Sequence, residues 1–360
     1  MPNPLHVGLL YGGVSSEHDV SILSARNVAR ALEAAGHRVT PIRIERDGRW
    51  LAERSSDALH THGAPSDGTL VHLAPGAGRD AVVVMDPAGA MPLGLDVVFP
   101  ILHGQNGEDG VVQGLLDALS LPYVGPGVLG SAVCMDKEVT KRLLQEAGLP
   151  VGPYLTVRAA SRDDLSAAAV GSALGWPVFV KPANSGSSVG VTRVVSADAL
   201  AAALDTAFRY DTKVLVEAAI AGREVECAVL GNEAPEASVL GEIVSTAAFY
   251  DYEAKYLDAD AARMEVPADL PADVSDRARA LAVQTYIALG CEGMARVDFF
   301  ATPDGGVLIN EVNTIPGFTA RSMYPVMWAH AGVDGPALAD RLVQLALARH
   351  ERDAALSTSR

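Results

Sequence analysis

The sequence predicts an α/β fold that opens with a doubly wound domain and continues into at least one further α/β unit. Three observations lead to this prediction. The chain begins with a strand, a glycine loop, a helix and a second strand, which is the start of a doubly wound sheet. Later apolar runs end in glycine-rich polar loops, and a hairpin near the C-terminus carries several acids. Because open α/β sheets bind ligands at the carboxyl ends of their strands, these loops are the candidate functional segments.

The length and composition set the bounds for any function. A chain of 360 residues predicts two or three domains, and 49% hydrophobic residues allow a substantial core. The net charge of -16 argues against a general nucleic-acid surface, so a phosphate ligand would need a few locally placed Lys and Arg. No apolar run is long enough to span a membrane. The three cysteines, which are far apart, fit a reduced cytoplasmic compartment, and the first residues indicate a strand rather than a signal peptide.

The first domain is predicted from its opening segments. Residues 6–11 form a buried-type strand, residues 19–35 a helix that ends at a glycine, and residues 39–44 a second strand. The intervening loop, GGVSSE, is not GxGxxG and does not support dinucleotide binding. Its backbone and Glu17 would lie at the ligand edge of the sheet, although the alternative that Ser and Glu only cap the helix stays open.

The next part of this domain is less regular. Residues 46–93 are rich in Gly, Pro, Ser and Asp and predict a peripheral insertion with loops, a hairpin turn at 46–49 and a short strand at 81–85. Residues 95–102 are a core strand that delivers the loop HGQNGEDG, which begins at His103, to the ligand edge. A single His after a strand is more often structural than catalytic, and the dense polar loop weakens that default. A helix at 111–118 follows.

After a linker at 122–130, an amphipathic helix is predicted over residues 131–148, and lysines on such a helix are usually solvated. Strands are expected at 150–157 and 177–181. The second leads into KPANSGSSVGV, whose small residues permit close approach of backbone N–H groups to phosphate oxygens. The spacing excludes a Walker A loop. A flexible hairpin is the alternative, but Lys181 at the base of the loop favours a lid over a triphosphate.

The rest of the chain predicts a second mixed sheet. Residues 213–217 form a strand whose end, with residues 218–221, would suit an adenine edge. Strands are also expected from residue 223 and at 241–245, and an aromatic polar loop at 249–256 is a candidate mobile lid. Helices at 272–289 and 337–349 complete the set.

The C-terminal hairpin carries the sharpest chemical signal. Two apolar runs, 295–300 and 306–309, flank a TPDG turn. Alternation along a strand puts Glu311 and Asn313 on one face, and Asp298 can face them from the partner strand. Two carboxylates and an amide oxygen are hard donors that suit Mg²⁺ completed by phosphates. Solvated surface acids are the alternative, but Arg296 and a Pro-Gly loop beside them favour the metal site.

These segments resemble the D-alanine–D-alanine ligases of the ATP-grasp superfamily over nearly the full chain. The matching motifs occur in the family's order: GGVSSEHDVS, HGQNGEDG, MDKEVTK, VKPANSGSSVGV, VEAAIAGREVECAV, YDYEAKY, ARVDFF and INEVNTIPGFTARSMYP. The resemblance implies a pre-ATP-grasp, Rossmann-like domain at 1–127, followed by a two-lobed ATP-grasp domain. Its central lobe with the phosphate lid would span 128–215, and its C-terminal lobe with the metal site 216–360. Residues 46–93 match less clearly and suggest the longer subgroup.

The resemblance also implies a reaction. ATP would phosphorylate the carboxylate of one D-alanine, and the amine of a second D-alanine would attack the acyl phosphate, giving D-alanyl-D-alanine for peptidoglycan precursors. Mg²⁺ would serve as two ions, with Mn²⁺ as a substitute, and the family suggests a homodimer. No nucleic acid or membrane partner is expected.

The site residues carried over by position fall into four groups. The catalytic group is Glu17, Ser187, Tyr256, Arg296 and Gly317. The group bordering the amino acids is His103, Ser322 and Met323. The ATP-binding group is Lys137, Lys181, Glu217, Ala218, Ile220, Glu224 and Lys255. The metal ligands are Asp298, Glu311 and Asn313, with Glu311 bridging the two ions.

The resemblance gives these residues individual roles. Glu17 would hold the ammonium of the first D-alanine, and Ser187 and Tyr256 would form hydrogen bonds near Glu17 that hold the lids closed. Arg296 and the Gly317 N–H would stabilise the oxyanion of the tetrahedral intermediate.

The remaining roles concern ATP and the second substrate. Lys255 would approach the γ-phosphate, and Glu224 would bind the ribose. Ser322 and Met323 would receive the carboxylate of the second D-alanine.

Two alternatives stay open. One is another ATP-grasp carboxylate–amine ligase, such as a D-alanine–D-lactate enzyme; the retained Tyr256 favours an amine as the nucleophile. The other is an ATP-binding regulatory module without turnover, against which the intact metal and Arg296 set argues. Met323 stands where leucine is common, and this change disturbs no charge.

Overall fold

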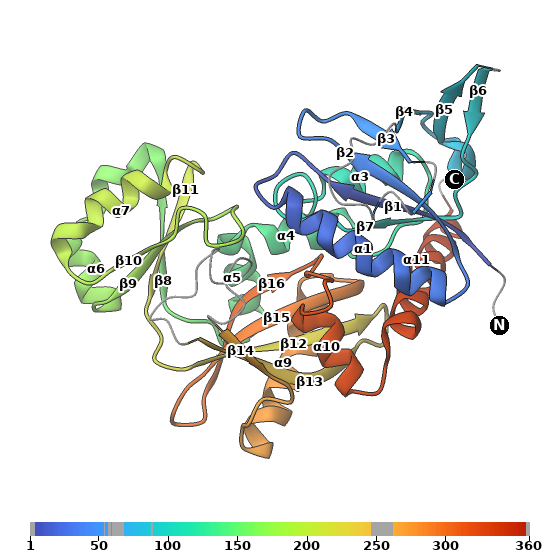
Figure 1. The fold of residues 1–360 in the computed structure, drawn as a ribbon. Helices are drawn as coiled ribbons and strands as arrows, with labels where there is room; N and C mark the ends of the chain where they lie inside the picture. The colour runs from blue at the N-terminus through green and yellow to red at the C-terminus, as the bar shows by residue number, and fades with distance from the viewer. Residues whose placement is uncertain are drawn as a thin grey trace.

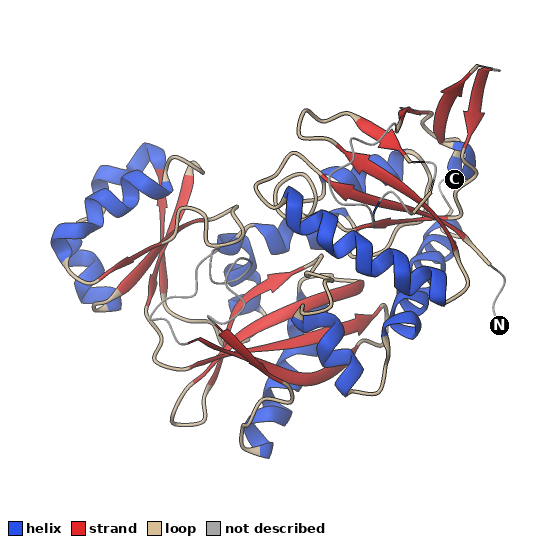
Figure 2. Cartoon of the chain, in the orientation of Figure 1, coloured by secondary structure: helices blue, strands red, loops and turns tan. Residues whose placement is uncertain are grey.

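The computed structural model describes residues 4–53, 55, 56, 59, 68–87, 89–245 and 262–357. It contains three β-sheets in three lobes, which surround a central region from different sides (Figure 1). Helices flank the sheets and also lie between lobes (Figure 2). The predicted α/β class is confirmed, and the order of the lobes along the chain matches the predicted N-terminal domain followed by two further units.

The first sheet is built around a strand that is buried along its whole length. β1 (His6–Gly12) pairs in parallel with β2 (Arg38–Ile44) on one side and with β7 (Val97–Pro100) on the other. α1 (His18–Ala34) connects β1 to β2, and α3 (Val111–Ala118) follows the β7 loop. The predicted opening of a doubly wound sheet is confirmed, so the loops after β1 and β7 end side by side at one edge.

The segment after β2 is more ordered than the sequence indicated. Four short antiparallel strands extend the sheet in the order β6-β5-β4-β3-β2-β1-β7. They are β3 (Trp50–Ala52), β4 (Thr69–Leu73), β5 (Val82–Asp86) and β6 (Gly89–Pro92). The strand predicted at 81–85 is confirmed as β5. The prediction of loops was wrong for β3, β4 and β6, because short strands at a sheet edge are half exposed and show little apolar periodicity. The turn at 46–49 is confirmed: the Glu45 N–H donates to Arg49 O at 2.8 Å.

The single helix predicted over 131–148 is two helices. α4 (Val128–Met135) ends at Asp136, whose ψ of 97° is extended, and α5 (Lys137–Glu146) begins at the next residue. The Asp136 carboxylate accepts the Val139 N–H at 3.1 Å and thus caps α5. Apolar periodicity alone does not reveal a break of one residue, and the linker before this region ends earlier than expected, at residue 127.

The second sheet has the order β10-β9-β11-β8, and the third has the order β14-β13-β12-β15-β16. The second consists of β8 (Tyr154–Arg158), β9 (Val178–Pro182), β10 (Thr192–Val194) and β11 (Lys213–Ala218), with α6 (Ala167–Leu174) and α7 (Leu200–Ala207). The third consists of β12 (Arg223–Gly231), β13 (Glu236–Ser245), β14 (Ala262–Glu265), β15 (Gly293–Ala301) and β16 (Val307–Asn313), with α9 (Ala272–Ala288). All pairings within these two sheets are antiparallel.

The C-terminal helices join the first lobe to the third. α11 (Gly335–Ala354) packs against α1, and α10 (Met323–His330) packs on β12 and β13. One core cluster contains buried residues from β1, α1, β7, α10 and α11, including Leu32, Tyr324 and Leu342. This shared core fixes the ligand edge of the first sheet above the third sheet.

The positions of the lobe boundaries are our proposal. We propose three units, at 1–127, 128–215 and 216–360, although one strand crosses the second boundary. β11 belongs to the second sheet and runs to Ala218, so it crosses the boundary at 215. Among the described residues, no helix is long and apolar enough to cross a membrane.

Candidate active site

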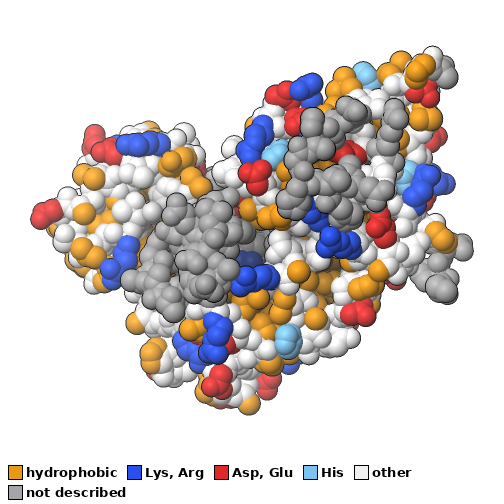
Figure 3. Space-filling view, in the orientation of Figure 1, with side chains coloured by type: hydrophobic (Ala, Val, Ile, Leu, Met, Phe, Trp, Pro, Cys, Tyr) orange, Lys and Arg blue, Asp and Glu red, His pale blue; other side chains and the backbone are white. Residues whose placement is uncertain are grey.

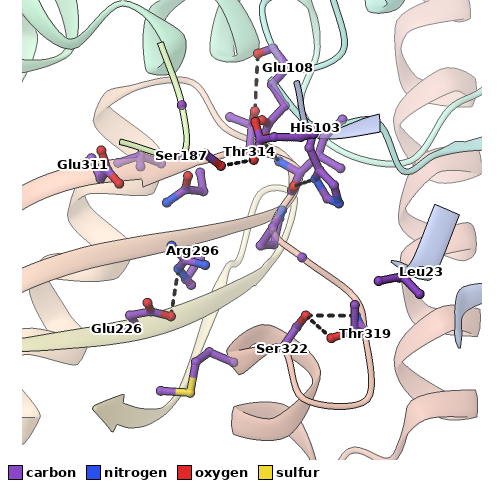
Figure 4. Close-up of a pocket in the computed structure, with 18 of the residues that line it drawn as sticks. Leu23, His103, Glu108, Ser187, Glu226, Arg296, Glu311, Thr314, Thr319 and Ser322 are labelled. Atoms are coloured by element: carbon purple, nitrogen blue, oxygen red, sulfur yellow. Dashed lines mark hydrogen bonds and ion pairs between the residues drawn. The ribbon is translucent and has the colours of Figure 1, made fainter. Parts of the chain in front are cut away.

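A cavity of about 620 Å³ lies where the three lobes meet. It is lined by α1, by the loop after β7, by residues of α4 and α5, by the loop at 185–187, and by β12, β15, β16 and the segment 314–323. On the face of the molecule shown in Figure 3, basic side chains lie near the middle, although the chain as a whole is acidic. Figure 4 shows labelled side chains from α1, the loop after β7, the loop at 185–187, the third sheet and the segment 314–323 around one space.

Most of the residues predicted from the sequence meet in this cavity. Those that line it are Glu17, His103, Lys137, Ser187, Arg296, Glu311, Asn313, Gly317, Ser322 and Met323. Five others lie outside the lining. Lys181 lies on β9, Glu217 and Ala218 lie on β11, Ile220 follows β11, and Glu224 lies near the start of β12. Asp298 is not part of the lining, but it accepts a hydrogen bond from Arg296, which is. Lys255 and Tyr256 are outside the described residues, as is the predicted lid at 249–256.

The β15–β16 hairpin brings its polar residues together as predicted. Asp298 is the register partner of Glu311, and Arg296 is the partner of Asn313. The Asn313 Nδ2 donates to Asp298 Oδ2 at 3.0 Å, and Arg296 donates to both oxygens of Asp298 at 2.7 Å. Arg296 also forms an ion pair of 3.0 Å with Glu226 (Figure 4). One guanidinium is therefore bound by two carboxylates. Burial opposes its charge, but Asp298, Glu226 and the nearby Glu311 raise the pKa of Arg296.

This surplus of negative charge fits a divalent cation. Within the described part of the chain, no group of three His, Cys, Asp or Glu lies close enough to hold a metal by itself. The donor set on the hairpin is two carboxylates and one amide. Such a set suits Mg²⁺, which is commonly held by one or two carboxylates and completed by phosphate oxygens and waters.

The glycine-serine loop is folded over the first lobe. The Ser187 hydroxyl donates to Glu17 Oε1, which joins the second lobe to the start of α1. Ser187 and Ser188 have φ of 48° and 59°, a conformation that non-glycine residues rarely adopt. Gly104 also lies against Glu17. Its φ is 76°, and a Cβ at this position would lie 2.8 Å from Glu17 Oε2, so no larger residue fits without strain.

The two lysines of α5 are not solvated: Lys141 is buried and Lys137 is half-buried. Lys137 Nζ donates to Ser185 O at 2.6 Å and lies 3.9 Å from Glu311, so it links the loop to the hairpin. Lys141 is 2% exposed and lies 3.3 Å from Glu217, a contact that the sequence did not indicate. Lys181 contacts the other oxygen of Glu217 at 2.8 Å.

These contacts set the charges at the base of the glycine-serine loop. Burial alone would raise the pKa of Glu217, but Lys181 and Lys141 lower it below its usual value. Burial opposes the charge on Lys181, yet Glu217 and Glu311 raise its pKa. The Glu217 carboxylate and Lys181 are therefore both charged.

His103 and a carboxyl that sequence reasoning missed lie at the other end of the cavity. Burial lowers the pKa of His103, whose Nδ1 lies 3.0 Å from Ile315 O. Glu108 accepts the Gly104 N–H at 2.6 Å and the Ile315 N–H at 3.1 Å. Burial, with the nearby charge of Glu17, raises the pKa of Glu108 to about 8.

Other contributors were also absent from the predicted set. They are Ser24, Asn27, Lys141 and Glu226, together with Arg26 and Arg30 of α1. For Ser24 and Asn27 only a weak signal was available: they are polar positions three residues apart on one face of α1, but Arg26 lies between them. For Glu226 it was not, because nothing in its strand pattern marks it as a partner of Arg296.

Two of the predicted site residues, Ser322 and Met323, lie at the start of α10. Ser322 is the residue before the helix, and its hydroxyl accepts the Thr319 N–H at 2.9 Å (Figure 4). Met323 is the first helical residue and is buried. The N-terminus of a helix favours a negative group, so this corner of the cavity suits a carboxylate.

Two family models cover most of the sequence. The D-ala D-ala ligase N-terminus model matches residues 6–126, and the D-ala D-ala ligase C-terminus model matches residues 143–344. The chain belongs to the D-alanine–D-alanine ligase family. The resemblance found from the sequence motifs is thereby confirmed.

Relatives in this family are similar over their full length. The chain is 49% identical to D-alanine–D-alanine ligase A of Escherichia coli strain K12, covering 99% of each chain. It is 50% identical to D-alanine–D-alanine ligase A of Chromobacterium violaceum, covering 99% of this chain and 98% of the relative.

Solved structures show the same fold. The D-alanine–D-alanine ligase from Coxiella burnetii superimposes with a TM-score of 0.86 at 38% identity, covering 98% of this chain and 96% of that chain. The VanG D-Ala:D-Ser ligase from Enterococcus faecalis superimposes with a TM-score of 0.84 at 34% identity, covering 96% and 100%. The family thus includes ligases with different second substrates.

The raised pKa of Glu108 predicts a pH-dependent stability. The ordinary pKa of this group is 4.5, so folding takes up a proton between about pH 4.5 and 8. The contribution of Glu108 to stability therefore falls as pH rises through this window, by up to about 1.4 kcal/mol per pH unit. Thermal unfolding of wild type and Glu108→Gln from pH 6 to 8.5 measures this: the Tm of wild type should fall relative to that of the variant. Parallel Tm curves would contradict the assignment.

Proposed function

We propose that the protein ligates two molecules of D-alanine to D-alanyl-D-alanine, using ATP and releasing ADP and phosphate, in the synthesis of peptidoglycan precursors. One observation carries this proposal. A carboxylate that can hold an ammonium, Glu17, an acid-rich hairpin and a guanidinium, Arg296, line a single cavity beneath a glycine-serine loop. This is the set that activation of an amino acid's carboxyl group by a triphosphate requires.

The first substrate would lie between Glu17 and the hairpin. Glu17 would bind its ammonium, and the hydrogen bond from Ser187 holds this carboxylate in place. The carboxylate of the substrate would then point at the γ-phosphate, and an acyl phosphate and ADP would form. Lys137 and Lys181 would bind the phosphates, and their positions at the edge of the glycine-serine loop support that role. Phosphoryl transfer depends mainly on such positioning and charge.

The metal ligands would be Asp298, Glu311 and Asn313. Two Mg²⁺ ions, with Mn²⁺ as a substitute, would neutralise the charge of the triphosphate when bound. The register pairing across the hairpin supports this ligand set, because it brings three oxygen-bearing side chains to one place.

The second step needs an oxyanion site. Arg296 and Gly317 both line the cavity, and the guanidinium and the Gly317 N–H would stabilise the negative oxygen of the tetrahedral intermediate. Arg296 is held by Asp298 and Glu226, so its guanidinium is oriented before substrate binds. The carboxylate of the second D-alanine would bind at Ser322 and Met323, at the N-terminus of α10.

The remaining assignments rest on the family resemblance. Glu217, Ala218, Ile220 and Glu224 would line the adenosine site, with Glu224 on the ribose. His103 would border the first substrate. Lys255 at the γ-phosphate and Tyr256 at the closed lid are proposed without structural support, since both lie outside the described residues. We also propose a homodimer in the cytoplasm, where the three free cysteines would stay reduced.

The proposal is tested by direct detection of the product. The protein is incubated with ATP, Mg²⁺ and D-alanine alone or with D-serine, D-lactate or L-alanine, and products are identified by mass spectrometry together with ADP. D-alanyl-D-alanine in a one-to-one ratio with ADP is expected. A mixed product as the main species would identify a ligase with another second substrate. ATP binding without ADP formation under any condition would indicate a regulatory module.

Glu311→Gln is expected to lower the turnover number by at least about 100-fold, because it removes the charge of a side chain that would hold the metal while keeping the shape of that side chain. The activity assay above measures this, and the Tm shows whether the variant is folded. Glu265→Gln, at a half-exposed acid on β14, is the matched control and should retain wild-type turnover. Near-normal activity of Glu311→Gln would refute the metal-ligand role.

A further inference from the structure

Both main-chain groups of Phe318 are bound by side chains from another lobe. The Phe318 N–H donates to Ser24 Oγ at 3.2 Å, and Phe318 O accepts the Asn27 Nδ2 at 2.9 Å. Ser24 and Asn27 lie three residues apart on α1 and therefore point in the same direction. Ser24 is fully buried, so its hydroxyl has few alternative partners.

The same loop is held at a second residue. Ile315 donates its N–H to Glu108 Oε1 at 3.1 Å, and Ile315 O lies 3.0 Å from His103 Nδ1. A carbonyl oxygen can only accept, so Nδ1 carries the proton and His103 Nε2 is an acceptor. The Ser24 hydroxyl, 3.2 Å from Nε2, then donates to it and accepts from Phe318. Every hydrogen bond in this chain thus has one defined direction.

Gly317 lies between these two fixed residues. Pro316 on one side has a restricted φ, but glycine itself has the widest backbone freedom of any residue. The ring of Phe318 is 1% exposed and packs against Phe99 and Tyr324, with ring centroids 6.1 and 5.6 Å away. This packing fixes the position of the ring. The hydrogen bond to Ser24 fixes the peptide group that follows Gly317, and the bond to Asn27 fixes the peptide group after Phe318. The contact between Ile315 O and His103 fixes the peptide group before Pro316, so the Gly317 N–H lies between two fixed peptide groups.

We propose that Ser24 and Asn27 are positioning residues for the reaction: they hold Phe318 so that the Gly317 N–H points into the cavity at the oxyanion of the tetrahedral intermediate. The inference rests on the proposed function, in which Gly317 donates to that oxyanion. The bonds from Ser24 and Asn27 to Phe318 explain why a glycine in a Pro-Gly loop keeps one orientation.

The position of α1 gives this arrangement a second consequence. Glu17, which would bind the first amino acid, immediately precedes α1, and Asn27 lies ten residues further on. A helix rises 1.5 Å per residue, so about 15 Å of rigid helix separates the two. The ammonium site and the oxyanion site are thus set by one element, although they belong to segments 300 residues apart in sequence.

The test uses one variant at each residue. Besides its bond to Phe318, Ser24→Ala removes the donor to His103 Nε2, a bond that Asn27→Asp leaves intact. Ser24→Ala removes the acceptor of the Phe318 N–H, and Asn27→Asp keeps the shape of the side chain while removing the donor to Phe318 O. Each should lower the turnover number for dipeptide about 10–100-fold, because small misplacements of a reacting group have such effects. The KM for ATP should stay within about twofold of wild type. Ser24→Thr, which keeps the hydroxyl, should recover activity relative to Ser24→Ala.

Matched controls exist elsewhere in the chain. Ser238 is equally buried and accepts the Ala228 N–H at 3.1 Å, and Asn232 Nδ2 donates to Leu345 O at 3.0 Å. Ser238→Ala and Asn232→Asp therefore remove the same kinds of bond away from the cavity, and both should leave turnover unchanged.

Hydrogen–deuterium exchange supplies a readout that does not depend on turnover. The peptide containing Phe318 should exchange about fivefold faster in Ser24→Ala than in wild type or Ser238→Ala. Faster exchange together with reduced turnover supports the inference. Unchanged exchange, or faster exchange with wild-type turnover, overturns it. If the wild type makes no dipeptide, the proposed function is wrong. The exchange result still shows whether α1 holds the loop.

Discussion

The structure depends on the register of one β-hairpin. Pairing of β15 with β16 sets Asp298 opposite Glu311 and Arg296 opposite Asn313. A shift of β16 by one residue would move Glu311 and Asn313 to the face opposite Asp298 and Arg296, because side chains alternate along a strand. Around this hairpin, Arg296 is bound by two carboxylates, and Lys137 lies within 3.9 Å of Glu311. The chemistry of the site is therefore a consequence of strand pairing, together with charges that other lobes supply.

The other lobes are brought to the hairpin by packing at the opposite end of the molecule. α11 closes the chain by packing against α1, and the two helices share a core with α10. This contact places the carboxyl ends of β1 and β7 above the third sheet (Figure 1). The second lobe is tied in by the hydrogen bond between Ser187 and Glu17. A substrate bound there would be enclosed from three sides, which excludes water from an acyl phosphate.

Much of this was predictable from local patterns. The opening strand, loop and helix, the hairpin with its acids and the glycine-serine loop each have a local signature, and the motif order identified the family. What the sequence did not reveal depends on tertiary contacts. The break at Asp136 is only one residue long, and the strands after β2 lie at a sheet edge, where periodicity is weak. Lys141 reads as a solvated helix residue until the second lobe is in place beside it.

The central claim is that a triphosphate activates the carboxyl group of the first amino acid. The most direct measurement uses D-alanine labelled with ¹⁸O in both carboxyl oxygens. If the carboxylate attacks the γ-phosphate, one labelled oxygen becomes the bridge of the acyl phosphate and leaves with phosphate when the second amine attacks. The account predicts one ¹⁸O atom in each phosphate released during dipeptide synthesis. Phosphate that carries no label would show that the carboxyl group was never phosphorylated and would contradict the account.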